Sequence, residues 1–312
     1  MNRPRIAVVG SLNMDLVVST ERMPRVGETI SGKTIHYIPG GKGANQAVGC
    51  ARLGAEVHMI GAVGDDMFGS VLMTNMKDNG VCTDGIGIIE HTPTGIASIL
   101  HTSEDNCIVI IPGANGAMTP ARVEQSARFI AQADLVLIQL EIPLESVYAA
   151  LRIARSAGVR TVLNPAPARD LSADLLQLAN CITPNETEFA SLGGFMETDG
   201  QDAWQDGLSN WEKRHDHKVI LTRGKHGASY RNNGQPVTIP APVVAAVDST
   251  GAGDCLNAAF GFGLASGWSI EQSLKFAVKA ASLCAGRGHH FARMVGQGIG
   301  PRGSIDCYRS AA

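Results

Sequence analysis

Residues 135–164 read LVLIQLEIPLESVYAALRIARSAGVRTVLN, and this stretch decides the fold class of the chain. It begins with an apolar run at 135–140, continues with apolar residues at helical spacing over 144–158, and returns to an apolar run at 161–164. Continuous runs of Leu, Val and Ile are typical of strands that are buried on both faces of a sheet. A buried strand, a helix and a second buried strand in succession indicate an α/β layered fold.

The same alternation extends over the rest of the chain, where further buried strands are predicted at 6–10 (IAVVG), 57–64 (VHMIGAVG) and 218–224 (KVILTRG). Helices are predicted at 44–54 and 120–133, where small or apolar residues recur at helical spacing. The 312 residues are enough for two domains. No linker rich in Pro or Ser and no charge run divides them, so we expect one large domain.

The composition indicates a globular protein with a small-molecule partner. Hydrophobic residues make up 44% of the chain, which is enough for a large buried core. The 26 Lys and Arg against 29 Asp and Glu give a formal charge of -3, so no basic field favours nucleic acid or an anionic membrane. The seven cysteines are scattered without a CxxC pair, and the apolar run near the N-terminus is too short for a signal sequence. We therefore expect a cytoplasmic protein with reduced thiols.

Two segments, 12–39 and 92–111, break the rhythm because they hold strand-like pieces with more polar alternation and no helix to cover them. They could form a small separate sheet, which would suit a lid that excludes water from a site. The alternative is an ordinary edge hairpin. The periodicity alone favours the hairpin.

Residues 247–267, VDSTGAGDCLNAAFGFGLASG, pass from a strand end through a glycine-rich turn into a helix of small and apolar residues. Gly251, Ala252 and Gly253 would let backbone N–H groups approach a phosphate, and the positive end of the helix would favour the charge that develops in phosphoryl transfer. Asp254 follows in the first turn, where a carboxylate could accept a proton from a hydroxyl. The alternative is an ordinary helix cap beside a flexible turn.

A second glycine-rich box, GGKGANQA, occupies residues 40–47. It matches neither the P-loop nor the dinucleotide-binding fingerprint, which argues against a Rossmann dehydrogenase. Its glycines would let the backbone approach a polyhydroxylated ligand, and Asn45 offers donors and acceptors to hydroxyl groups. Polar residues also follow the predicted strands, where α/β proteins place their ligands, and we expect them to share one polar pocket. These residues are Asn13, Asp15, Glu141 and Asn164.

The two boxes in tandem, GGKGANQA with Gly54 and Gly64 beyond it and DSTGAGD at 248–254, resemble the paired signatures of the PfkB family of carbohydrate kinases. Other segments are similar to the ribokinase branch of that family and occur in the expected order. They are IVIIPGAN at 108–115, QLEIPLESV at 139–147, NPAPAR at 164–169, TPNETE at 183–188 and LTRGKHG at 221–227.

The resemblance spans about residues 5–283 and implies a ribokinase-like three-layer α/β/α core. Its central sheet would be mostly parallel. Residues 12–39 and 92–111 would form a small β-sheet lid, through which members of this branch commonly form homodimers.

For the sugar side, the resemblance implies ATP-dependent phosphorylation of D-ribose at O5. Asp254 would be the general base, and the amides of Gly251, Ala252 and Gly253 would form the anion hole. The residues implied for sugar binding are Asn13, Asp15, Gly41, Lys42, Gly43, Asn45, Glu141 and Asp254. Carboxylates and amides suit a neutral sugar, whereas a phosphorylated sugar would require more Lys or Arg.

Two alternatives to a ribose kinase stay open at this point. The nearest is a kinase for 2-deoxyribose or for another unphosphorylated sugar or nucleoside, because one hydroxyl changes few pocket residues. The alternative from another class is a non-catalytic, sugar-binding regulatory protein.

For the nucleotide side, the resemblance implies ATP, Mg²⁺ and a monovalent cation, usually K⁺. The NxxE element from Asn185 to Glu188 is associated with the network of Mg²⁺ and phosphates. Asp248 and Thr250 match two ligand positions of the monovalent cation, which would order the loop electrostatically. The residues implied for nucleotide binding are Asn185, Glu188, Thr222, Arg223, Gly224, Gly227 and Gly253.

The resemblance stops after KFAVKAASL at 275–283. Residues 284–312, CAGRGHHFARMVGQGIGPRGSIDCYRSAA, show no helical apolar repeat, so we expect coil there. The family places its remaining cation ligands in this region. Our hypothesis is a frameshift near codons 283 to 285, which would weaken K⁺ activation and leave Asp254 intact.

Two further clusters favour structural interpretations. His215, Asp216 and His217 could suggest a metal site, but their place just before a predicted strand indicates a solvated surface turn. Trp204 and Trp211 are spaced as on one face of a helix. No basic residues are interleaved with them, so an apolar helix face is favoured over a stacking platform for nucleic acid.

Overall fold

The computed structural model describes residues 3–102, 106–195, 203–215, 217–244 and 250–286. Its centre is a seven-stranded sheet with strand order β11-β10-β9-β8-β1-β4-β5, in which every pairing is parallel. Its strands are β1 (Arg5–Val9), β4 (Glu56–Gly64), β5 (Val81–Ile89), β8 (Leu135–Ile138), β9 (Arg160–Leu163), β10 (Cys181–Ile182) and β11 (Lys218–Val219). The expected parallel central sheet is therefore confirmed.

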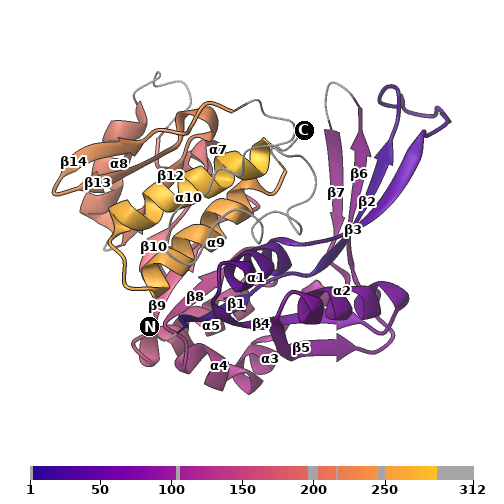
Figure 1. Cartoon of the computed structure of the whole chain (residues 1–312), viewed down its shortest axis with the longest axis horizontal. Helices are drawn as coiled ribbons and strands as arrows, with labels where there is room; N and C mark the ends of the chain where they lie inside the picture. The colour runs from indigo at the N-terminus through magenta and orange to yellow at the C-terminus, as the bar shows by residue number, and fades with distance from the viewer. Residues whose placement is uncertain (1–2, 103–105, 196–202, 216, 245–249, 287–312) are drawn as a thin grey trace, which may run out of the picture.

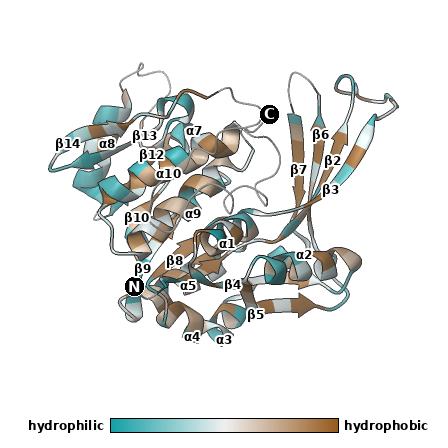
Figure 2. Cartoon of the chain, in the orientation of Figure 1, coloured by the Kyte–Doolittle hydropathy of each residue, from teal (hydrophilic) through white to brown (hydrophobic). Residues whose placement is uncertain are grey.

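Helices cover both faces of this sheet and complete the three layers (Figure 1). In β1, Ile6 and Val8 pack into one core cluster while Ala7 and Val9 pack into the other, and all four are fully buried. Water reaches neither face, which explains the continuous apolar runs that appear as brown strands between the helices in Figure 2. One face carries α1 (Lys42–Arg52), α2 (Met67–Asp78), α9 (Ala252–Ala265) and α10 (Ile270–Ala285). The other carries α3 (Pro120–Gln125), α4 (Ala127–Ala131), α5 (Leu144–Ser156), α6 (Ala173–Leu176), α7 (Glu186–Ser191) and α8 (Ala203–Arg214).

A separate four-stranded sheet of order β3-β2-β6-β7 projects from the layered body (Figure 1). Its outer pairs are antiparallel and its central pair, β2 with β6, is parallel. The edge-hairpin interpretation is therefore wrong. Pairing of β2 with β6 buries Val17, Ala97 and Ile99 in a small cluster, a long-range contact that periodicity within one segment does not reveal. The strands are β2 (Asn13–Ser19), β3 (Thr34–Gly40), β6 (Gly95–His101) and β7 (Asn106–Ile111).

Two predicted elements are divided in the structure. The run 218–224 contributes β11 to the central sheet and then leaves it, so that β12 joins a three-stranded antiparallel sheet. The predicted helix 120–133 is interrupted at Ser126. The remaining elements are β12 (Leu221–Thr222), β13 (Ala228–Asn232), β14 (Gln235–Ile239) and the 3-10 helices η1 (Gly113–Ala117) and η3 (Gly224–His226).

The tryptophans of α8 form an apolar helix face, as predicted, since Trp204 and Trp211 are both buried. The surface-turn interpretation is wrong for His217, which is only 5% exposed. The indole N–H of Trp211 donates to His217 Nε2 at 2.8 Å, so this histidine is a hydrogen-bonded core residue. Asp216 lies outside the described residues.

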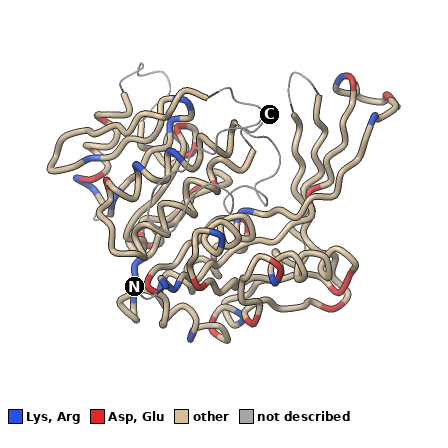
Figure 3. The backbone as a smooth tube through the Cα atoms, in the orientation of Figure 1, with Lys and Arg blue, Asp and Glu red and all other residues tan. Residues whose placement is uncertain are grey.

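Acidic and basic positions are interspersed along the backbone of the described residues (Figure 3). Across the described ranges, the helices include none that is both long and apolar enough to cross a membrane.

The first turn of α1 lies directly against the end of β1 at Gly43. A Cβ at this position would stand 2.7 Å from the carbonyl carbon of Gly10 and 2.7 Å from the backbone nitrogen of Ser11. Both are backbone atoms that cannot rotate away. The approach of α1 to the central sheet therefore requires glycine at position 43.

We predict that Gly43→Ala lowers the free energy of unfolding by about 1–3 kcal/mol, because the added methyl forces α1 away from β1. Urea titration followed by circular dichroism measures the change. Gly116→Ala is the control, since its Cβ would meet only the Pro112 side chain at an ordinary 3.4 Å. Equal stability of Gly43→Ala and the wild type would show that the close approach is not required.

Candidate active site

At the glycine-rich turn before α9, a helix N-terminus and a carboxylate lie together. Gly251 is the N-cap residue and has a φ of 77°, a left-handed conformation that favours glycine. Because the N-cap residue is a glycine, it has no side chain with which to cap the N–H groups of the first turn of α9, at Ala252 and Gly253. Asp254 lies in the same turn and is only 7% exposed. This arrangement offers amide donors to an anion beside a buried carboxylate.

Both oxygens of the Asp254 carboxylate are held by amides of α1. Asn45 Nδ2 donates to Oδ2 at 3.0 Å, and Gln46 Nε2 donates to Oδ1 at 3.0 Å. Gln46 is fully buried, whereas Asn45 is half-buried. The two glycine-rich boxes of the sequence therefore meet at Asp254.

The start of α1 forms a second set of contacts, with Glu141. Gly41 is the N-cap of α1 with a φ of 91°, and a Cβ there would stand 2.7 Å from the backbone nitrogen of Asn13. The backbone N–H of Lys42 donates to Glu141 Oε2 at 3.2 Å, and the Ser11 hydroxyl donates to the same oxygen at 2.5 Å. Glu141 follows β8, so the carboxyl end of that strand and the start of α1 share one carboxylate.

Four acidic side chains and one Lys act on one another at this edge of the sheet. Burial alone would lower the pKa of Lys42, but nearby carboxylates outweigh it and raise that pKa. The carboxylates, in order of their effect, are Asp254, Glu141, Glu188 and Asp15. The Lys42 ammonium is therefore the positive charge that offsets a cluster of negative ones.

Three carboxyl groups in this cluster have raised pKa values: those of Asp15, Asp254 and Glu188. Burial, followed by the charges of Glu141 and Asp254, raises the pKa of Asp15 to about 7. Burial also raises the pKa of Asp254, against the opposing effects of Lys42 and the two amides of α1. A carboxyl whose pKa is raised toward neutrality is a better proton acceptor than an ordinary aspartate.

Asn13 is fixed at the base of the four-stranded sheet by Asn115. Asn115 Nδ2 donates to Asn13 Oδ1 at 2.8 Å, and Asn115 Oδ1 accepts from the backbone N–H of Leu12 at 2.9 Å. Asn115 lies in η1, directly after β7, and is fully enclosed. It therefore ties the end of β7 to the start of β2.

The nucleotide-side residues lie on α7 and the adjoining turn. Asn185 and Glu188 form a capping box at the start of α7, and an isolated bridge pairs Asn185 with Thr222. Burial raises the pKa of Glu188. The charge of Lys42 lowers that pKa, and the charge of Asp254 raises it. Gly224 and Gly227 flank the turn η3 with positive φ. The NxxE element and the turn after β12 thus lie together, within electrostatic range of Asp254.

Arg223 has partners of its own in this region. Its Nε donates to Glu186 at 3.2 Å, and its guanidinium lies 4.3 Å from the ring centroid of Trp204. The ion pair and the cation–π contact fix the side chain and offset its charge.

Most of the positions predicted to bind the monovalent cation lie outside the described residues. Asp248 and residues 287–312 of the tail lie outside the described residues, and Thr250 directly precedes Gly251. Over the described part of the chain, His, Cys, Asp and Glu form no group of three that could hold a metal ion.

The structure brings together most of the residues predicted for the site and adds three that the sequence reasoning missed. Ser11 binds Glu141, Gln46 binds Asp254 and Asn115 binds Asn13. Gln46 and Asn115 lie inside the segments GGKGANQA and IVIIPGAN, and Ser11 directly follows β1. Their position was a usable signal, but their partners are distant in sequence.

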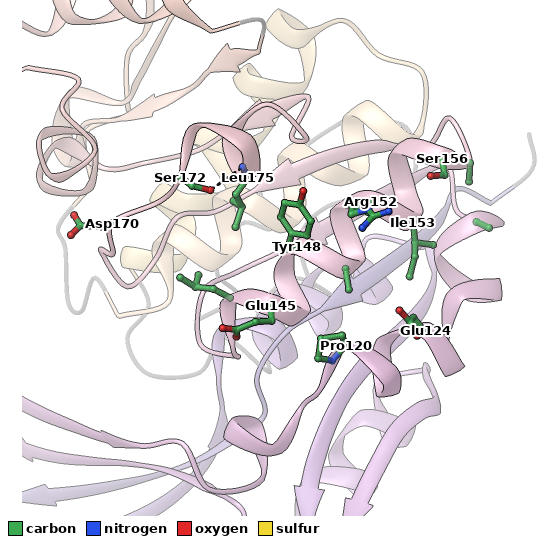
Figure 4. A pocket seen from close by; sticks show the side chains of 14 residues that line it. Pro120, Glu124, Glu145, Tyr148, Arg152, Ile153, Ser156, Asp170, Ser172 and Leu175 are labelled. Atoms are coloured by element: carbon green, nitrogen blue, oxygen red, sulfur yellow. Dashed lines mark hydrogen bonds between the residues drawn. The ribbon is translucent and has the colours of Figure 1, made fainter.

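A groove of about 1000 Å³ opens on the opposite helical layer (Figure 4). It lies mainly along α5, where Tyr148 and Arg152 face it, with Glu124 and Asp170 at its margins. None of the residues that line it contacts Asp254 or its amide partners. The convergence of charged groups, rather than this groove, therefore locates the candidate active site.

We predict that Asp15→Asn raises the melting temperature at pH 8 by about 3 °C or more and has less effect at pH 5. The folded-state pKa of Asp15, about 7, lies above that of an unfolded aspartate, so ionisation destabilises the fold as the pH rises toward 7 and beyond. Differential scanning calorimetry at both pH values measures the difference. The control is Asp84→Asn, at an exposed position of β5, and an equal gain for Asp15→Asn at both pH values would contradict the prediction.

Comparison with known proteins assigns the chain to a family. The family model described as pfkB family carbohydrate kinase matches residues 3–290. Bacillus subtilis ribokinase is 44% identical over 278 residues, which cover 89% of this chain and 92% of the relative. Salmonella typhi deoxyribokinase is 35% identical over 280 residues, which cover 89% and 91%. A solved structure of Arabidopsis thaliana ribokinase complexed with ribose and ATP is 33% identical with a TM-score of 0.86, covering 93% of this chain and 95% of that one. This chain belongs to the pfkB family of carbohydrate kinases.

Proposed function

We propose that this protein phosphorylates D-ribose at O5 with ATP, and that Asp254 is the general base. The observation that carries the proposal is the carboxylate of Asp254, buried in the first turn of α9 after the N-cap Gly251, with both oxygens fixed by α1. The similarity to ribokinases over most of the chain supports ribose as the sugar.

In the proposed reaction, Asp254 takes the proton from the O5 hydroxyl as that oxygen attacks the γ-phosphorus of ATP. The new O5–P bond forms while the bond from the γ-phosphorus to the β,γ-bridging oxygen breaks, and ADP leaves with that oxygen. The N–H groups at Gly251, Ala252 and Gly253 lie next to the base and would stabilise the negative charge on the transferred group. Lys42 offsets the charge of the neighbouring carboxylates.

The sugar would lie between the start of α1 and the base of the four-stranded sheet. The carboxylates of Asp15 and Glu141 and the amides of Asn13 and Asn45 can each accept from or donate to hydroxyl groups. The backbone at Gly41, Lys42 and Gly43 approaches this space closely, because Gly41 and Gly43 have no side chains. Four acceptor-rich groups around one Lys suit a neutral polyol better than a sugar phosphate.

ATP would lie on the α7 and α9 side, next to Asn185, Glu188, Thr222 and the turn from Gly224 to Gly227. Arg223 would shape this surface while its charge stays paired with Glu186. Mg²⁺ fits this set of residues, because Glu188 is a half-buried carboxylate and Mg²⁺ usually takes one or two carboxylates beside phosphates and water. When bound, Mg²⁺ would neutralise phosphate charge.

Activation by K⁺ through Asp248 and Thr250 stays a prediction, as does the effect of the tail on it. We also propose that the layered body is one catalytic domain in the cytoplasm and that the four-stranded sheet is its lid. Since β2 carries both Asn13 and Asp15, movement of this sheet would move two groups of the sugar site.

2-Deoxyribose is the second candidate substrate, because deoxyribokinases match the chain at 35% identity over the same length. The two sugars differ in one hydroxyl, which a hydrogen-bonding pocket can discriminate strongly. Parallel assays of ADP release with ribose, 2-deoxyribose, fructose and adenosine, with and without K⁺, distinguish these possibilities. Sugar binding without turnover would instead support a regulatory protein.

We predict that Asp254→Asn lowers kcat with ribose by about 10²–10⁴-fold and leaves ribose binding largely intact, because an amide cannot take the proton. A coupled assay of ADP release gives kcat, and titration calorimetry gives the affinity for ribose. Asp84→Asn serves as the control at an exposed carboxylate. Unchanged turnover of Asp254→Asn would remove this residue from the mechanism.

We further propose that two copies of the chain associate through the four-stranded sheet. Its edge strand β7 is exposed along all six residues, and four of them are large and apolar. Ile108 and Ile110 pair with Ile99 and Ala97, so they extend the apolar face of the small cluster to an open edge. An apolar edge of this kind favours pairing with another sheet.

We expect the wild type to sediment as a dimer and Ile108→Lys to sediment as a monomer, because the charge would be buried at the contact. Analytical ultracentrifugation over a range of concentrations provides the measurement. Val71→Lys, on the exposed surface of α2, is the matched control. A monomeric wild type, or an Ile108→Lys variant that still dimerises, would refute this contact surface.

A further inference from the structure

Gln46 occupies the centre of a chain of buried amides that ends at Asp254. Its Nε2 donates to Asp254 Oδ1 at 3.0 Å and to Asn164 Oδ1 at 3.3 Å, while its Oε1 accepts from Gln139 Nε2 at 2.7 Å. Gln46 and Gln139 are both fully buried. Every polar atom of the Gln46 side chain is therefore in use.

The carboxylate of Asp254 sets the direction of this chain. An ionised carboxylate only accepts hydrogen bonds, so Gln46 has to present its NH₂ group to Asp254 and its carbonyl oxygen to the other side. A buried carbonyl needs a donor there, and Gln139 supplies it. Donation thus runs from Gln139 through Gln46 to Asp254.

The central sheet fixes both partners that orient the Gln46 amide. Gln139 follows β8 and packs against Gly10, where an added Cβ would stand 2.0 Å from Gln139 Oε1. Asn164 follows β9 and donates to the carbonyl oxygen of Thr183 at 3.3 Å. The amide that reaches Asp254 is therefore tied to the ends of two buried strands and cannot rotate freely.

The two oxygens of Asp254 have different surroundings as a result. Oδ1 faces Gln46, which water does not reach, and Oδ2 faces the half-buried Asn45 on the sugar side. We propose that Gln46 is a positioning residue that holds Oδ1 of Asp254 so that Oδ2 receives the proton of the sugar hydroxyl, with Gln139 fixing its orientation. This inference rests on the proposed role of Asp254 as the base.

The hydrogen bond from Gln46 favours the carboxylate over the protonated acid, because only the carboxylate is a strong acceptor. Burial is the main cause of the raised pKa of Asp254, and the charge of Glu141 adds to it. The Lys42 ammonium and then the hydrogen bonds from Gln46 and Asn45 oppose that rise. Loss of Gln46 should therefore raise the pKa of Asp254 further. More of the base would be protonated at neutral pH, and the activity lost there would be recovered at alkaline pH.

The experiment is the pH dependence of kcat/KM for ribose in Gln46→Leu, which keeps the approximate size of the side chain and removes its donor. The acidic limb of the profile should move upward by about one pH unit, with kcat at pH 7 reduced by about tenfold. Ribose affinity, measured by calorimetry, should change much less than kcat. Gln139→Leu leaves the bond to Asp254 in place but removes the group that orients it, so its limb should move in the same direction by a smaller amount.

The matched control is Thr161→Val in β9, away from Asp254. This substitution removes a buried hydroxyl that is hydrogen-bonded to Asn180. Thr161→Val should lower the melting temperature without moving the acidic limb of the pH profile of kcat/KM. A parallel loss of kcat/KM at every pH in Gln46→Leu, or an unmoved profile, would overturn the inference.

Two further variants keep the test decisive. If Gln46→Leu does not fold, Gln139→Leu carries the test alone, and an unmoved limb in that variant overturns the inference. Asp254→Asn assayed in parallel separates the two proposals. Full activity in Asp254→Asn removes the proposed role of Asp254 as the base, whereas an inactive Asp254→Asn with an unmoved acidic limb in Gln46→Leu removes only the role of Gln46.

Discussion

Asp254 and the two amides that hold it lie 208 and 209 positions apart in the chain, and the rest of the site is arranged around their contact. A buried carboxylate is costly unless hydrogen bonds and a nearby positive charge compensate it. Asn45, Gln46 and Lys42 provide that compensation, and all three belong to the first two turns of α1. Packing α1 against α9 is therefore an electrostatic requirement as well as a hydrophobic one. It brings the start of α1, where we propose that the sugar binds, and the start of α9, where we propose that the phosphates bind, to the same edge of the sheet.

The charged side chains of the site distinguish its proposed sugar side from its proposed nucleotide side. One Lys, Lys42, is surrounded by the four carboxyl groups of Asp15, Glu141, Asp254 and Glu188. The side chains of the site are therefore rich in hydrogen-bond acceptors and short of donors. A polyol brings hydroxyl donors to these acceptors, whereas a nucleotide polyphosphate brings further negative charge. The sugar side and the nucleotide side are consequently not equivalent. In the proposed complex, the amides at the start of α9 and the Lys42 ammonium would offset the negative charge of the polyphosphate beside these carboxylates.

Much of the fold could be predicted because parallel strands that are buried on both faces appear in the sequence as short continuous runs of apolar residues. The runs at 6–10, 57–64 and 135–140 correspond to β1, β4 and β8, since both faces of these strands are covered. The four-stranded sheet was not favoured by periodicity because its central pairing, β2 with β6, joins segments far apart in sequence. The run at 218–224 was misjudged for a similar reason: one apolar run serves two sheets.

The site could be predicted as a set of residue types but not as a set of contacts. Glycine boxes and polar strand ends identified Asp254, Asp15 and Glu141, because backbone approach and carboxylate chemistry depend on local residue identity. Gln46 lies inside the box GGKGANQA, but nothing in that box indicates its hydrogen-bond partners. Its importance follows from Gln139 and Asn164, which reach it only through the order of strands in the sheet. In the same way, His217 gave the local pattern of a surface turn, but a tertiary contact with Trp211 buries it.

The N-cap and the first five residues of α1 serve both halves of the candidate site: Gly41 and Lys42 contact the strand ends, and Asn45 and Gln46 contact Asp254. An α-helix turns by about 100° for each residue, so inserting or deleting one residue between Lys42 and Asn45 would carry both amides away from Asp254. The spacing inside this box is thus locked by geometry. Divergence toward other sugars would instead involve the four-stranded sheet, since the two amides that hold Asp254 belong to α1 and not to that sheet.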